Sequence, residues 1–135
     1  MKLAKVLGWV AMLVLAAGCA SSGGDSRKLQ QTLYAYQGAL RWSDFGGAAS
    51  FLDPAKREEL ALKDLEARRW EQYQVAGYYV QGNETSEDEV KQVVELRLIN
   101  KHTQVERSVI DRQVWRWDRE AKAWWLTTPL PDLGR

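Results

Sequence analysis

Apolar residues in the first half of the chain recur with the period of an α-helix. Four of them fall at i, i+4, i+7 and i+11, which places them on one stripe of an amphipathic helix: Leu29, Leu33, Tyr36 and Leu40. The stripe predicts a helix that begins near Arg27 and ends at Trp42. Asp25 or Ser26 caps its start, because a short polar side chain there accepts a hydrogen bond from a free backbone N–H.

Two shorter helices are predicted next. Ser43 and Asp44 are capping residues for the second helix. Its apolar face carries four side chains: Phe45, Ala48, Ala49 and Leu52. Pro54 after Asp53 is typical of the first position of a helix, where the missing N–H has no partner to lose. A third helix is therefore expected over 55–69.

After residue 70 the apolar period changes from 3.6 to two, which is typical of strands. A first strand is expected around 73–80, with Tyr73, Val75 and Tyr79 on one face. The acidic stretch 82–88 is expected to be a loop. The following strand has five alternate residues on one face: Val90, Gln92, Val94, Leu96 and Leu98.

A hairpin is predicted next, with a two-residue turn at either Asn100–Lys101 or His102–Thr103. Both turns bring the same residues of the second strand beside the apolar row of the first. Those residues are Val105, Arg107, Val109, Asp111, Gln113, Trp115 and Trp117. A turn over 118–122 leads to a last strand over 123–128, which two prolines end.

Helices followed by a run of antiparallel strands indicate an α+β fold, in which N-terminal helices pack on one face of a curved antiparallel sheet of about four strands. The order of elements resembles the nuclear transport factor 2-like superfamily, of cystatin-like architecture. Three features carry the resemblance: the helix from Leu29 to Trp42, the segment from Asp44 to Asp53, and the tryptophan-rich strands at 114–117 and 124–126. It covers about residues 27–130 and implies a cone-shaped sheet that curls around the long helix and can leave a cavity.

Charge and composition narrow the classes of partner. The 135 residues carry 19 Lys and Arg against 18 Asp and Glu, so no basic excess is present to bind the phosphates of nucleic acid. One Cys excludes a disulfide framework and a multi-cysteine metal site, and one His makes a histidine-rich metal site improbable. No cofactor and no metal are therefore expected.

The beginning of the chain resembles a bacterial lipoprotein signal. Lys2 and Lys5 precede an apolar run over 6–15, and small residues then lead to Cys19, the only cysteine. The run is short for a membrane-spanning helix, which needs about 20 residues. The resemblance implies cleavage before Cys19 and lipidation of its thiol, while Ala20 implies sorting to the outer membrane.

Three segments follow from this interpretation. Residues 1–18 are expected to be the lipoprotein signal peptide, and residues 19–26 the lipidated cysteine with a flexible Ser/Gly tether. Residues 27–135 are expected to form a single α+β domain. The lipid would hold this domain at the outer membrane, on its periplasmic side.

Four residues on the predicted inner face of the hairpin are candidates for the lining of a pocket: Arg107, Asp111, Gln113 and Trp115. Three interpretations stay open. Arg107 and Asp111 form an ion pair in a structural polar patch, or the four residues contact a ligand. In the third, Asp111 is a carboxylate in an apolar cavity, with a raised pKa and a catalytic role in proton transfer. No catalytic residue is assigned.

Six of the seven tryptophans follow Cys19, and neighbouring Trp124 and Trp125 must point to opposite faces of a strand. Some of the rings therefore lie outside the core, where they cover the sheet end or contact a partner. The leading hypothesis is a non-catalytic outer-membrane lipoprotein that binds a protein partner or an envelope ligand, with a homodimer through the open sheet face as one form. The alternatives are an enzyme of isomerase, cyclase or dehydratase type that uses Asp111, and a structural subunit of an envelope complex.

Overall fold

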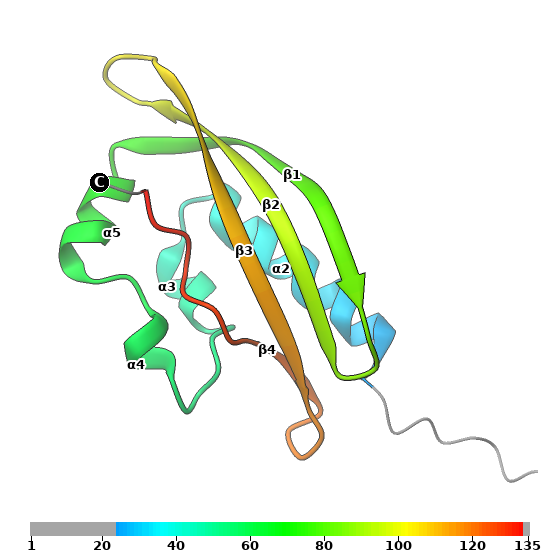
Figure 1. The fold of residues 1–135 in the computed structure, drawn as a ribbon. Helices are drawn as coiled ribbons and strands as arrows, with labels where there is room; N and C mark the ends of the chain where they lie inside the picture. The colour runs from blue at the N-terminus through cyan, green and yellow to red at the C-terminus, as the bar shows by residue number, and fades with distance from the viewer. Residues whose placement is uncertain (1–23, 134–135) are drawn as a thin grey trace, which may run out of the picture.

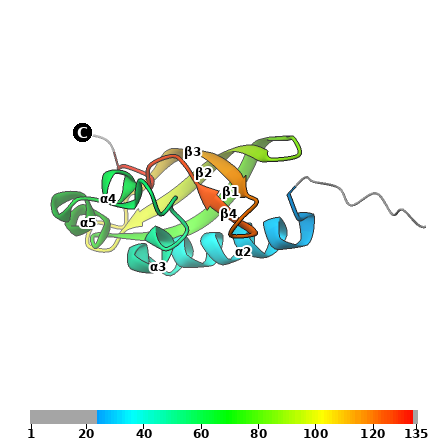
Figure 2. The same cartoon turned by 90° about the horizontal axis from the view of Figure 1, so that it is seen from below.

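The computed structural model describes residues 24–133, with helices first and strands afterwards (Figure 1). The helices are α2 (Ser26–Arg41), α3 (Phe45–Ala49), α4 (Arg57–Leu60) and α5 (Asp64–Trp70). The strands are β1 (Tyr73–Thr85), β2 (Glu89–Asn100), β3 (Glu106–Asp118) and β4 (Ala123–Leu126). They form one antiparallel sheet in the order β1-β2-β3-β4, and α2 lies across one face of it (Figure 2). The predicted α+β class, with helices on a four-stranded antiparallel sheet, is confirmed.

The long helix α2 has the boundaries and the buried stripe that its sequence predicts. The Asp25 carboxylate accepts a hydrogen bond from the Lys28 N–H at 3.0 Å and caps the first turn. At the other end the chain turns left-handed at Ser43, whose φ is 56°. The N–H groups of Ser43 and Asp44 then donate to the carbonyls of Leu40 and Ala39, at 3.0 and 2.8 Å, which closes the helix.

The third predicted helix is wrong, because the segment 55–69 forms two short helices instead of one. The Asp53 side chain accepts a hydrogen bond from the Ala55 N–H at 3.0 Å, so Pro54 stands in a turn rather than in a helix. The Asp53 N–H donates to the carbonyl of Leu126 at 2.8 Å and fastens this turn to β4. Between α4 and α5 the backbone is extended at Ala61, whose ψ is 156°.

Strand β1 is longer than predicted and does not alternate regularly. Its pairing with β2 shifts between Val75 and Gly77 and again between Val80 and Gly82, so each shift inserts one extra residue. Because of the first shift, Tyr78 rather than Tyr79 follows Val75 on the inner face, opposite Leu96. The predicted loop over 82–88 is also wrong in part, because residues 82–85 continue the ladder.

The β2–β3 hairpin has the predicted inner face. Val94 lies opposite Asp111, Gln92 opposite Gln113, and Val90 opposite Trp115. The register is that of a turn centred on His102–Thr103, but residues 101–105 form a longer loop, with Gln104 at a φ of 59°. Val105 is exposed in this loop, so its predicted place beside the apolar row is wrong.

The core lies between α2 and the inner face of the sheet. The ring of Tyr36 meets that of Trp115 edge to face, with their centroids 5.1 Å apart. The segment after β4 also contributes, because Leu130 and Leu133 are buried and the indole N–H of Trp70 donates to the carbonyl of Pro131 at 3.0 Å. β4 ends at Leu126, two residues before the predicted strand end at residue 128, and this segment follows it.

The predicted tether is shorter at its domain end than the sequence suggests. Gly24 donates its N–H to the carbonyl of Glu87 at 2.6 Å, Asp25 caps α2, and Ser26 begins that helix. The signal peptide and Cys19 lie outside the described residues. Within residues 24–133, no helix has the length and apolar character needed to cross a membrane.

Candidate functional site

A cluster of polar side chains lies on the inner face of the sheet, beneath α2. Gln113 is at its centre and donates from its amide to Asp111 at 2.7 Å and to the Tyr78 hydroxyl at 3.0 Å. The amide oxygen of Gln113 accepts from the indole of Trp115 at 3.0 Å and from Gln92 at 3.4 Å. Three of the four predicted lining residues, Asp111, Gln113 and Trp115, are therefore brought together.

Burial governs the acid–base behaviour of this cluster. Desolvation raises the pKa of Asp111 to about 6, although the hydrogen bond from Gln113 and the neighbouring Tyr36 hydroxyl both act in the opposite direction. The same desolvation raises the pKa of Tyr78 to about 12. The Tyr36 hydroxyl has no hydrogen bond of ordinary length to the described residues, yet it lies close enough to Asp111 for each group to shift the other's pKa.

The predicted ion pair between Arg107 and Asp111 is wrong. The Arg107 guanidinium donates to the carbonyl of Leu133 and lies over the ring of Tyr73, 5.8 Å from its centroid. Asp111 accepts a hydrogen bond from the Gln113 amide, and among the described residues it forms no ion pair with a cation. Arg107 is exposed near the start of β3. Its acceptor is a backbone carbonyl of the C-terminal segment, and no sequence pattern predicts that contact.

The cluster is closed to solvent. Asp111 is 2% exposed, and Gln113 and Trp115 are buried as well. Buried polar groups are almost always hydrogen-bonded, and these side chains meet that need mainly with one another. The arrangement therefore acts first as a polar part of the core.

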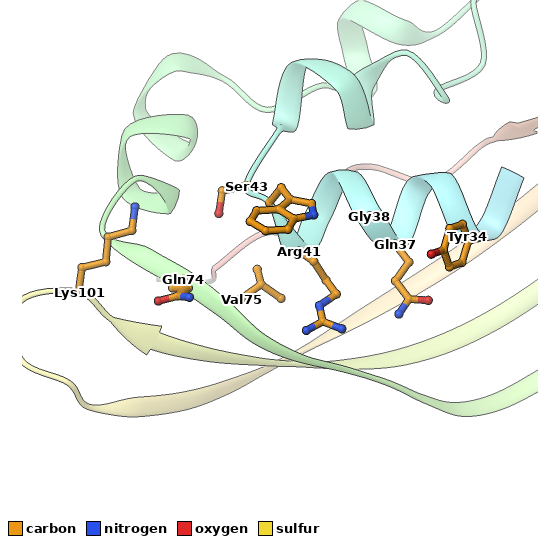
Figure 3. Close-up of a pocket in the computed structure, with 9 residues that line it drawn as sticks. Tyr34, Gln37, Gly38, Arg41, Ser43, Gln74, Val75 and Lys101 are labelled. Carbon is orange, nitrogen blue, oxygen red and sulfur yellow. The ribbon is translucent and has the colours of Figure 1, made fainter. Parts of the chain in front are cut away.

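A groove of about 710 Å³ lies on the other side of α2, between that helix and β1 (Figure 3). Trp42 and Tyr34 line it and are 87% and 78% exposed, the largest values among the large hydrophobic side chains of the described residues. The other lining residues come from α2, the turn after it, the start of β1 and the β2–β3 loop: Gln37, Gly38, Arg41, Ser43, Gln74, Val75 and Lys101.

Helical spacing and the turn after α2 build this groove. Tyr34, Gln37 and Arg41 stand at i, i+3 and i+7, so they share one face of α2, and the last two point toward β1 (Figure 3). The left-handed turn at Ser43 ends the helix directly after Trp42. The residues that line the groove are separate from the buried stripe, which lies on a different face of α2.

The groove has a basic and amide-rich lining. Its charged residues are Arg41 and Lys101, and no acidic residue lines it. The Lys101 ammonium donates to the backbone carbonyl of Glu71 at 2.9 Å. The Arg41 guanidinium makes no hydrogen bond to the described residues, so its donors are available to a bound molecule.

The groove residues Tyr34, Arg41 and Trp42 were not predicted as site residues. The one signal toward Trp42 was the set of six tryptophans after Cys19, some of whose rings must lie outside the core, and no predicted pattern singled out Tyr34 or Arg41. Among residues 24–133 no group of three or more His, Cys, Asp or Glu side chains is arranged to hold a metal ion.

No protein-family model matches the chain, and no curated protein matches it either. Among solved structures, it is similar to the solution structure of a SEC-C motif-containing protein from Rhodopseudomonas palustris. The TM-score is 0.54 and the sequence identity 17%, over 85% of this chain and 82% of that one. At this identity the likeness concerns the fold alone.

Proposed function

We propose that this protein is a lipid-anchored, non-catalytic binding module on the periplasmic side of the outer membrane, with Cys19 as the lipidated residue. One observation carries the binding function: the two most exposed large apolar side chains of the described residues, Trp42 and Tyr34, line the same groove. Exposed apolar surface gathered in one place is typical of a site that another molecule covers.

The position of the groove supports display away from the membrane. The chain enters the domain beside the β1–β2 loop and the β3–β4 turn, where Gly24 contacts Glu87 and the indole of Trp124 donates to the carbonyl of Asp25 at 3.0 Å (Figure 1). Only residues 20–23 separate Cys19 from Gly24, a span of at most about 18 Å. This end of the domain therefore lies nearest to a lipid on Cys19.

Helix α2 runs from that end toward the groove. A helix of 16 residues is about 24 Å long, and Trp42 stands at its far end. The C-terminal segment and α5 lie at the same far end (Figure 1). A partner reaching the groove would approach from the periplasm rather than from the bilayer.

The nuclear transport factor 2-like interpretation remains part of this proposal. Its support is the order of elements, with the long helix α2 first and the antiparallel sheet packed on it. The non-catalytic assignment is supported by the closed polar cluster, because a substrate would have to displace core side chains to reach Asp111. We accordingly place the binding function at the groove and not at the cluster.

The experiment introduces a photo-crosslinking amino acid at position 42 of the full chain in cells. The control is position 65, where Leu65 is 63% exposed on α5 and does not line the groove. We expect discrete adducts from position 42 and none of the same size from position 65. Equal adducts from both positions, or none from position 42, would refute a binding role for the groove.

Lipidation is tested in the same cells. Cys19→Ser should abolish acyl labelling and release the protein from the membrane fraction, because the thiol that carries the lipid is lost. The matched control is Ser21→Ala, which alters a neighbouring small residue and keeps the thiol. A wild-type chain that carries no acyl label would contradict the anchor.

A further inference from the structure

We infer that the groove between α2 and β1 binds an extended peptide segment that carries at least one carboxylate. This inference rests on the proposed function of the groove and names the chemistry of its occupant. The binding residues are Arg41, Trp42 and Tyr34 of the helical wall, with the β1 edge as the opposite wall.

The extended conformation follows from the sheet edge that forms one wall. β1 is the first strand in the sheet order, and no strand of residues 24–133 pairs with its outer edge. Unpaired N–H and C=O groups on such an edge can hydrogen-bond to an added strand. The opposite edge is different, because β4 is bridged to Leu52 and bonded to Phe51 and Asp53.

The irregularities of β1 limit what can add to this edge. Extra residues between Val75 and Gly77 and between Val80 and Gly82 break the edge into short pieces. Such bulges hinder long edge-to-edge pairing between copies of a protein. A short peptide segment beside Gln74 and Val75 is compatible with the unbroken piece that lines the groove.

The positive charge of the groove lining favours a carboxylate on the bound peptide. The only charged groups in the lining are the cations of Arg41 and Lys101, and an arginine guanidinium binds a carboxylate through two parallel hydrogen bonds. The carboxyl end of a helix ordinarily repels an anion. Here the carbonyls of Leu40 and Ala39 already accept from the N–H groups of Ser43 and Asp44, so fewer carbonyl oxygens at this end of α2 are free.

The glycine in the helical wall, Gly38, supports the close approach of a peptide independently of the charge. A glycine inside a helix lowers stability relative to alanine, and nothing lies within 4 Å of the place where a Cβ would stand at Gly38. Packing of the domain therefore does not require glycine at this position. Its absent side chain leaves the helical wall of the groove open to the close approach of a peptide backbone.

The experiment selects peptides from a displayed library of random short sequences. The bait is the full chain with Cys19→Ser, so that no lipid is present. We expect enriched sequences to carry Asp or Glu next to β-branched or aromatic residues. Arg41→Glu should weaken binding of the selected peptides by about tenfold or more, because a charge-assisted pair becomes a repulsive one. Arg112→Glu reverses an exposed charge on β3 outside the groove and should leave binding unchanged.

Gly38→Ala separates binding from folding. It should weaken binding of the selected peptides severalfold, while the urea midpoint of the domain stays constant or rises. The matched control is Gly82→Ala, since Gly82 also has no atom within 4 Å of a built Cβ and lies outside this groove. Unchanged binding in Gly38→Ala would contradict a close backbone approach.

The peptide selection and the crosslinking at position 42 together distinguish failure of the inference from failure of the proposed function. Selected peptides without acidic residues, or equal binding by Arg41→Glu, would overturn the carboxylate. No enrichment above a bait with Trp42→Ser would overturn the peptide as occupant. If adducts still form at position 42 in cells, the groove binds a molecule of another class, such as a glycan. If they do not, the proposed function fails with the inference.

Discussion

The two sides of α2 use polar and apolar residues in opposite ways. On the inner side, Asp111 and Gln113 are buried and hydrogen-bonded to neighbours within the domain. On the outer side, Trp42 and Tyr34 are exposed, and Arg41 has no hydrogen bond to the described residues. Buried polar side chains are thus poor guides to function when they hydrogen-bond to one another. Exposed apolar side chains that lie close together are better guides, because a bound molecule would remove their surface from water.

The difference has an energetic basis. A buried carboxyl or amide without a partner costs about 1–3 kcal/mol, so a sheet that places Asp111 and Gln113 inward must pair them. No comparable constraint acts on Trp42, whose ring stays in water unless something covers it. Substitutions on the inner side of α2 should therefore change stability far more than substitutions on its outer side.

The largest effect should come from two positions at the end of α2, Leu40 in its last turn and Trp42 at its C-cap, which face opposite sides. Leu40→Ala should lower the free energy of unfolding by about 2–5 kcal/mol, because Leu40 is fully buried and the change leaves a cavity. Trp42→Ala should change it by less than about 0.5 kcal/mol, since the ring is exposed. Urea denaturation of both variants measures the difference. A cost below about 1 kcal/mol for Leu40→Ala would mean that the buried stripe is misplaced.

A smaller effect, with a pH dependence, is expected at Asp111. Well below pH 3.8 this carboxyl is protonated in both the folded and the unfolded chain. As the pH rises toward 6, the unfolded chain loses the proton first, because burial raises the pKa in the folded state to about 6. The folded state therefore binds more protons, and this group's contribution to stability falls as the pH rises, reaching its full penalty above about pH 6.

Asp111→Asn removes that penalty while keeping an oxygen that accepts from Gln113. At about pH 7.5 the variant should be more stable than the wild type by about 1–3 kcal/mol, and at about pH 3, where the carboxyl is protonated in both states, the two should be almost equal. Urea midpoints at both pH values measure this. An ion pair with Arg107 predicts the opposite sign, with a less stable variant at about pH 7.5.

Much of the fold could be predicted because it depends on local patterns. The stripe of α2 and the inner face of the β2–β3 hairpin follow from periods of 3.6 and two, and both hairpin turns considered preserve the same parity. The irregularities of β1 were not predicted, although an isolated glycine follows each extra residue, Gly77 after Ala76 and Gly82 after Gln81, and a glycine inside a strand pattern indicates a bulge. The partner of Arg107 could not be predicted, because it is set by a tertiary contact. The guanidinium donates to the carbonyl of Leu133, 26 residues along the chain.

The candidate site was harder to predict than the fold. Asp111, Gln113 and Trp115 were correctly placed on the inner face, but parity says nothing about whether that face encloses a cavity. Trp42 was recognised only as the end of a helix. Its exposure depends on the left-handed turn at Ser43, a conformation that sequence patterns associate with glycine rather than serine.

The smallest effect is expected at that turn. Ser43 has a φ of 56°, where a side chain is strained and glycine is not. Ser43→Gly should raise the free energy of unfolding by about 0.5–1 kcal/mol, because the relief of strain exceeds the extra entropy of the unfolded chain. Ser43→Val should lower it, since a β-branched residue tolerates positive φ least. Urea midpoints of the two variants measure the effect, and adduct formation at position 42 should persist in Ser43→Gly because the turn keeps its shape. A less stable Ser43→Gly would show that the serine side chain, rather than the turn alone, stabilises the end of α2 beside the groove.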